Sequence, residues 1–101
     1  MLKQCLRRKP NVQIEWTDGR FSPPMSVAEA AEILKEWCGV EKPIYYFENL
    51  IVNAAMSIEA ESYPDGTEDE KISIQDKWIE IIYHEPNRHG RFGFGRITYL
   101  N

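Results

Sequence analysis

Two stretches near the end of the chain, 78–85 and 91–100, alternate hydrophobic and polar residues and are rich in β-branched and aromatic side chains. The residues between them, Pro86–Gly90, are of the types that favour turns. The pattern therefore predicts a C-terminal antiparallel β-hairpin with a five-residue loop.

The hairpin register is predicted from its charges. We expect Glu85 to face Arg91 and Glu80 to face Arg96, because opposite charges directly across an antiparallel pair stabilise it. A shift by one residue would exchange the two faces of each strand, and a shift by two would separate both ion pairs.

This register divides the hairpin into two unlike faces, because side chains alternate along a strand. The face with Gly93 and Gly95 is expected to meet the core, since glycine lets another element approach closely. The other face mixes aromatic and charged residues, which is typical of a surface that a partner, a second copy or a helix of the same chain covers. The predicted partner-binding residues on it are Trp78, Ile82, Phe92, Phe94 and Arg96.

The clearest helix is predicted for residues 26–38. Ser26 is a good N-cap, and Glu29, three residues later, completes a capping box. Hydrophobic residues recur at helical spacing up to Cys38, and Gly39 is a typical residue after a helix end.

A second helix is predicted for about 45–61. Its hydrophobic residues recur at helical spacing, and Pro43 and Pro64 suit positions just before and just after a helix. A strand is the alternative, because hydrophobic and polar residues alternate from Met56 to Ala60 and acidic residues near a helix C-terminus oppose its dipole.

Two shorter stretches add strands to the prediction. Val12, Ile14 and Trp16 alternate with polar residues, and Ile72 and Ile74 begin a strand that either continues or bends before the hairpin. The predicted fold is α+β, a small antiparallel sheet of three to four strands with both helices on its glycine-bearing face.

The length suits one globular domain, predicted for residues 12–101, after a basic tail over 1–11. We find no hydrophobic run of the roughly 20 residues that span a bilayer and no signal-peptide pattern, so we expect no membrane contact and a cytoplasmic location. Two cysteines, Cys5 and Cys38, are too few to indicate a disulfide framework.

Charge is distributed unevenly around a net value of −4, with four basic residues in 1–10 and seven acidic residues in 48–70. A sequence pI of about 5.2 argues against a small ribonuclease, which needs a cationic surface to hold phosphates. His84, Glu85 and His89 have the side chains for metal binding or acid–base chemistry, but the predicted register points His84 and Glu85 to opposite faces and no third ligand is evident. No catalytic residue, metal, cofactor or small-molecule substrate is therefore predicted.

The segment Arg91–Ile97 resembles the RNA-stacking octamer of the RNA-recognition motif. In that resemblance Phe92 and Phe94 correspond to the aromatic residues that stack on bases. The pattern has glycine and valine where this chain has Arg91 and Gly95, and the segment covers under a tenth of the sequence.

A second segment, Met25–Leu34, is similar to the opening helix of excisionase-like helix-turn-helix proteins. That resemblance implies DNA binding, with the C-terminal hairpin as a basic wing. The helix that would enter the major groove, within 45–61, carries no Arg or Lys, so any contact falls to the tail and the wing. The residues predicted for nucleic-acid contact are Arg88, His89 and Arg91.

The interpretation that the residues favour is a non-catalytic interaction or regulatory protein of the inhibitor, immunity or accessory-factor type. It would bind a protein partner, or a second copy of itself, through the aromatic and charged strand face. A nucleic-acid-binding module is the alternative, and a small nuclease ranks below both.

Overall fold

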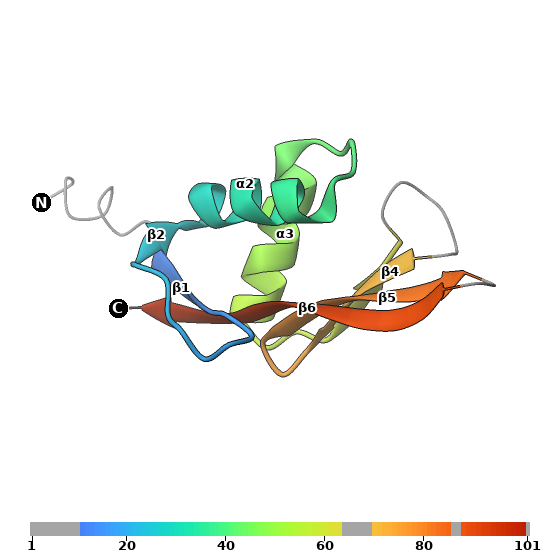
Figure 1. Ribbon diagram of the computed structural model, residues 1–101. Coiled ribbons are helices and arrows are strands. Elements are labelled where there is room, and N and C mark those ends of the chain that lie inside the picture. The colour runs from blue at the N-terminus through green and yellow to red at the C-terminus, as the bar shows by residue number, and fades with distance from the viewer. Residues whose placement is uncertain (1–10, 64–69, 86–87, 101) are drawn as a thin grey trace, which may run out of the picture.

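The computed structural model describes residues 11–63, 70–85 and 88–100. Two helices pack on one face of a six-stranded antiparallel sheet, so the α+β class is confirmed and the sheet is larger than the predicted three to four strands (Figure 1). The strands lie in the order β2-β1-β6-β5-β4-β3. The elements are β1 (Asn11–Glu15), β2 (Met25–Ser26), α2 (Val27–Cys38), α3 (Ile44–Ala55), β3 (Ala60–Ser62), β4 (Glu70–Gln75), β5 (Trp78–Glu85) and β6 (Arg88–Leu100).

Helix α2 confirms the predicted helix and both of its ends. The hydroxyl of Ser26 accepts a hydrogen bond from the Glu29 amide at 3.1 Å, and the Glu29 carboxylate accepts one from the Ser26 amide. At the other end, Gly39 has a left-handed φ of 69° and its amide donates to the Lys35 carbonyl. Local capping chemistry therefore fixes this helix.

Helix α3 begins as predicted but ends at Ala55 rather than at residue 61. The amides of Ser57 and Ile58 donate to the carbonyls of Ala54 and Asn53 at 2.9 and 2.8 Å, which is the Schellman arrangement. Ser57 takes the left-handed φ of 60° that glycine usually supplies. The chain then turns back and pairs as β3 from Ala60, so the helix prediction is wrong for this end of the segment, and the alternation that began at Met56 becomes a strand only at its last residue.

The strand that we expected to continue or bend near Asp76 reverses there. Asp76 and Lys77 have φ values of 52° and 69°, the two positive values that a type I′ hairpin turn needs. Gln75 consequently faces Trp78, and β4 and β5 form a tight hairpin. The Lys77 carbonyl also accepts a hydrogen bond from the Ile97 amide at 2.9 Å, which ties the turn to β6.

The β5–β6 hairpin is present, but its predicted register is wrong. Strand β6 begins at Arg88, opposite Glu85, and Glu80 faces Gly93 instead of Arg96. The predicted charge pairs are therefore not opposite each other. Exposed ion pairs contribute only about 0–1 kcal/mol each, which is too little to set a register against hydrophobic packing.

A β-bulge in β6 decides which side chains reach the helices. The register shifts between Ile79, which faces Gly95, and Glu80, which faces Gly93. Phe94 is thus the extra residue, and only 2% of its surface is exposed. The bulge brings Phe94 to the helix side of the sheet, whereas strict alternation in the predicted register placed it on the opposite side.

The core fills the space between the two helices and this side of the sheet. Helix α3 supplies Phe47, the largest of the fully buried side chains, and the strands supply mainly isoleucine, whose branched side chain packs well on a pleated surface. Its fully buried large side chains are Val12, Ile14, Leu34, Phe47, Ile51, Ile72, Ile74, Ile79 and Ile97.

Replacing Gly95 with alanine is expected to destabilise the fold by about 1–3 kcal/mol. A Cβ there would lie 2.9 Å from the Glu15 carbonyl oxygen and 2.9 Å from Ile14 Cγ2, so β1 would have to move away. Gly90→Ala is the matched control, because its nearest atom would be 3.7 Å away, on the Phe92 ring. Urea denaturation followed by tryptophan fluorescence compares the two variants, and equal midpoints would contradict this packing.

Candidate functional site

The structure divides the five predicted partner-binding residues between the two faces of the sheet. Phe92 and Phe94 lie on the helix side, because Phe92 faces a buried isoleucine of β5 and the bulge turns Phe94 inward. Trp78, Ile82 and Arg96 lie on the opposite side, which we call the outer face. Neither described helix covers this face (Figure 1).

On the outer face, Trp78 and Arg96 are engaged within the fold. A Cβ at Gly93 would lie 2.3 Å from the Trp78 ring, so the ring rests on bare backbone. Arg96 faces Glu15 across the ladder and forms an exposed ion pair with Asp76 at 3.4 Å. Both side chains therefore have structural contacts that account for their positions.

A shallow hollow of about 380 Å³ lies on the outer face above β4, β5 and β6. Its lining residues are Ser73, Gln75, Asp76, Trp78, Glu80 and Arg96. Across the described ranges, no three His, Cys, Asp or Glu side chains are grouped to hold a metal, and no buried polar side-chain atom lacks a hydrogen-bond partner. The outer face thus has the mixed charge of a solvated antiparallel sheet.

Aromatic side chains from three elements meet on the helix side. The ring of Phe94 makes edge-to-face contacts with Trp16, which follows β1, and with Trp37 of α2, at centroid distances of 5.6 and 5.2 Å. Two residues before Phe94 in β6, the ring of Phe92 makes an edge-to-face contact with the ring of Tyr83 at a centroid distance of 5.2 Å. We call these five residues the aromatic cluster. Such edge-to-face pairs contribute about 0.5–1.5 kcal/mol each beyond the area they bury.

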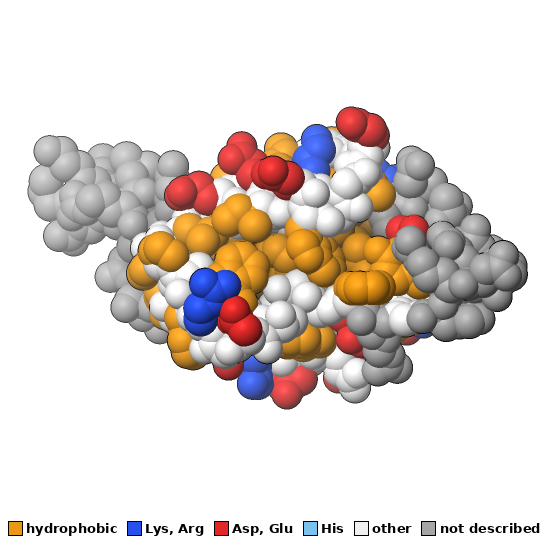
Figure 2. Space-filling model, in the orientation of Figure 1, with side chains coloured by type: hydrophobic (Ala, Val, Ile, Leu, Met, Phe, Trp, Pro, Cys, Tyr) orange, Lys and Arg blue, Asp and Glu red, His pale blue; other side chains and the backbone are white. Residues whose placement is uncertain are grey.

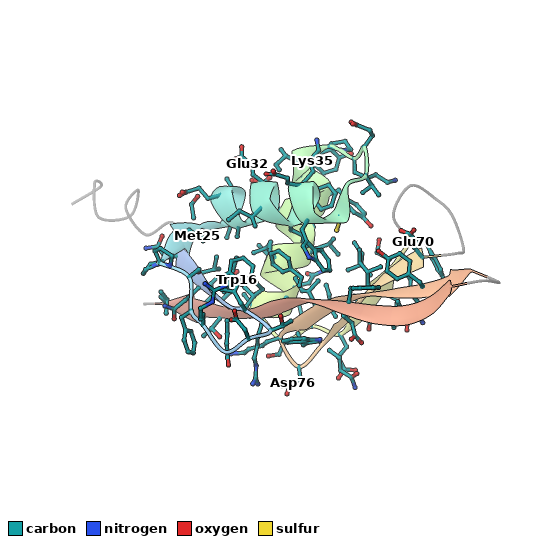
Figure 3. The ribbon with its side chains drawn as sticks, viewed as in Figure 1. Trp16, Met25, Glu32, Lys35, Glu70 and Asp76 are labelled. Carbon is teal, nitrogen blue, oxygen red and sulfur yellow. The ribbon has the colours of Figure 1, made fainter. Side chains whose placement is uncertain are left out.

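The aromatic cluster is partly open to solvent. Phe94 is buried beneath it, whereas Trp37 is 38% and Phe92 is 55% exposed. Hydrophobic side chains gather along the seam between α2 and the sheet (Figure 2), and Trp16 lies in that seam beneath α2 (Figure 3). Exposed aromatic residues around a buried one are typical of an interaction surface.

Sequence reasoning missed Trp16, Trp37 and Tyr83 as parts of one surface. Trp16 and Trp37 lie at the ends of their elements, where the hydrophobic periodicity is least able to predict which way a side chain points. The signal that was available is the spacing of Gly93 and Gly95 around Phe94, because isolated glycine inside a strand indicates a bulge.

Acidic side chains lie on the solvent-exposed side of α2, next to the seam. On this side, helix α2 carries the carboxylates of Glu29, Glu32 and Glu36 (Figure 3 labels Glu32). Strand β6 carries three arginines and no acidic residue over its length. The predicted nucleic-acid contacts at Arg88, His89 and Arg91 concern side chains that lie outside the described ones.

The burial of Phe94 bears directly on the resemblance to the RNA-recognition motif. A base cannot stack on a ring that is 2% exposed and enclosed by two tryptophans, so the role implied for Phe94 is wrong. The fold implied by the helix-turn-helix resemblance is also wrong. The described residues form a six-stranded sheet, whereas that family has only a small β-wing.

Cys38, at the end of α2, has a thiol of low reactivity. Burial, with a smaller contribution from the nearby Glu70 carboxylate, raises the pKa of Cys38 to about 12. Since the thiolate is the nucleophile and the metal ligand, this cysteine is a packing residue near neutral pH.

Comparison of the chain with known proteins found no matching family model, no matching curated protein and no matching solved structure. Within the described residues, neither helix is long and apolar enough to cross a membrane. The interpretation of the aromatic cluster therefore rests on its geometry and chemistry.

Truncation of the two phenylalanines should separate the buried from the exposed part of the aromatic cluster. Phe94→Ala is expected to lower the free energy of unfolding by about 3–5 kcal/mol, because it removes a buried ring. Phe92→Ala should lower it by less than about 1 kcal/mol, because that ring is more than half exposed. Chemical denaturation of both variants gives the comparison, and a similar loss in both would refute the assigned burial.

Alkylation should test the environment of Cys38 in a Cys5→Ser variant. Iodoacetamide at pH 8 is expected to react slowly with the native protein and rapidly in denaturant, because a thiol with a pKa of about 12 is almost fully protonated. Mass spectrometry follows the reaction. Rapid labelling of the folded protein would show that the thiol is not shielded in this way.

Proposed function

We propose that this protein is a small non-catalytic binding module whose protein partner docks on the aromatic cluster. The observation that carries the proposal is a pair of exposed rings on the helix side, Trp37, which packs on the buried Phe94, and Phe92, two residues before Phe94 in β6. Tryptophan, tyrosine and phenylalanine are enriched at the centres of protein interfaces.

The aromatic cluster is held in place before any partner arrives. Its rings come from the loop after β1, from α2 and from the β5–β6 hairpin, and each of them packs edge-on against another. Rings fixed in this way lose little side-chain entropy on binding, so more of the contact energy contributes to affinity. A regulatory protein of the inhibitor, immunity or accessory-factor type, acting in the cytoplasm, would use such a surface.

The charges beside the seam add a preference for the partner. A complementary surface would have an apolar centre and basic groups toward the carboxylates of α2. The same carboxylates disfavour a nucleic acid, whose phosphates would lie beside them. The outer-face residues Trp78, Ile82 and Arg96 are a second, weaker candidate, since Trp78 and Arg96 already have contacts within the fold.

The test is the capture of partners from the native host with Phe92→Glu as the disrupting variant. A charge placed at this exposed ring of the aromatic cluster should abolish specific capture while the protein stays folded, as checked by circular dichroism. Tyr45→Glu is the matched control, because Tyr45 is 64% exposed but stands in the first turn of α3.

Binding of the captured, purified partner is then measured by calorimetry for both variants. Unchanged affinity of Phe92→Glu would refute the proposal. A gel shift with single-stranded RNA at low salt that weakens on Arg91→Glu would favour the nucleic-acid alternative instead. Sedimentation of the purified protein distinguishes a second copy from a different partner.

A further inference from the structure

Strand β6 extends beyond its neighbour on one side. It runs from Arg88 to Leu100, and β5 pairs along its first part from Arg88 onward. On the other side, β1 pairs only with the segment 96–100. Residues 88–94 therefore have β5 on one side, and within the ranges that the structure describes no strand pairs with them on the other side, which we call the open edge.

The pairing also shows which backbone groups this edge presents. The innermost pair of the hairpin, Glu85 with Arg88, can only be a pair that exchanges hydrogen bonds, because two residues separate them. Counting in twos, Gly90 and Phe92 direct their amides toward β5. His89 and Arg91 therefore direct their N–H and C=O groups toward the open edge, where unpaired groups are a template for another strand.

The open edge adjoins the aromatic cluster. Phe92 and Phe94 stand on the helix side of the same stretch, whereas the position of Arg91 belongs to the outer face because it faces Ile82. A strand laid along this edge would send alternate side chains to each side of the sheet. Those on the helix side would meet the exposed rings of Phe92 and Trp37.

We propose that the partner inserts an extended segment along the open edge of β6 as a seventh strand, with apolar and acidic residues in alternation. Apolar side chains would cover the aromatic cluster on the helix side, and acidic ones would lie on the outer face, on which the position of Arg91 lies and to which residues 88–94 contribute no acidic residue. The inference rests on the proposed function and names its binding mode.

Charge argues against a second copy as the occupant of this edge. Antiparallel pairing of two β6 edges about Gly90 would set Arg91 of each copy opposite His89 of the other, with Arg88 opposite Phe92. Two Arg88 and two Arg91 residues would thus gather along one seam, and no acidic residue of either edge would offset their mutual repulsion. An acidic strand removes this repulsion.

The first test uses a synthetic eight-residue peptide of alternating valine and glutamate, labelled with fluorescein. Fluorescence anisotropy should show saturable binding to the full chain. The same peptide with N-methyl groups on alternate amides, and a valine–lysine peptide, should each bind at least about tenfold more weakly, because they lose backbone donors or charge complementarity. Equal binding of all three peptides, or none by the first, would overturn strand addition.

Amide hydrogen exchange locates the bound peptide. In the free protein, the amides of His89 and Arg91 should exchange rapidly while those of Gly90 and Phe92 are protected by pairing with β5. Adding the valine–glutamate peptide should slow exchange at His89 and Arg91. Protection elsewhere, with these two unchanged, would refute the assigned edge.

A proline variant separates the binding mode from the surface. Arg91→Pro removes an outward amide at a place where an edge strand tolerates proline, and Arg91→Thr is the control that keeps the amide and loses the same charge. Strand addition predicts loss of peptide and partner binding for proline and at most a few-fold weakening for threonine. If Phe92→Glu abolishes partner binding while Arg91→Pro leaves it intact, strand addition is wrong and the proposed function stands. If Phe92→Glu also binds normally, both are wrong.

Discussion

The contact that the rest of the structure depends on is the packing of Phe94 between Trp16 and Trp37. Three elements distant in sequence meet at this one ring, and it reaches them only because β6 bulges there. Full burial of a phenylalanine is worth about 1.5–3 kcal/mol, which exceeds the about 0–1 kcal/mol that an exposed charge pair offers. The register, the division of the faces and the exposed aromatic surface all follow from that difference.

How much of the fold the sequence predicts depends on how local the chemistry is. Helix α2 is predicted to both ends, because Ser26, Glu29 and Gly39 carry their capping preferences with them. The end of α3 is not, because Ser57 holds the left-handed position without the glycine that would announce it. The β4–β5 turn is missed for the same reason, since Asp76-Lys77 lacks the usual glycine.

The candidate site shows a different limit. Composition drew attention to the aromatic residues and arginines of the final hairpin, but which face of the sheet each of them occupies depends on a single inserted residue. One bulge moved Phe94 to the other side of the sheet, and a tighter turn moved Phe92 with it. Trp16 and Trp37 join them only through tertiary packing, which no pattern within either segment encodes.

The position of β6 between β1 and β5 has a consequence for how the chain folds. Ile14 of β1 pairs with Ile97 of β6, which lies about 80 residues later in the chain. Contacts of such long sequence separation make loop closure slow, so we expect folding in milliseconds to seconds rather than microseconds. During synthesis, β1 and the hydrophobic side of α2 emerge well before the strand that covers them. The nascent chain therefore passes through a period in which its core residues are accessible to chaperones and to aggregation.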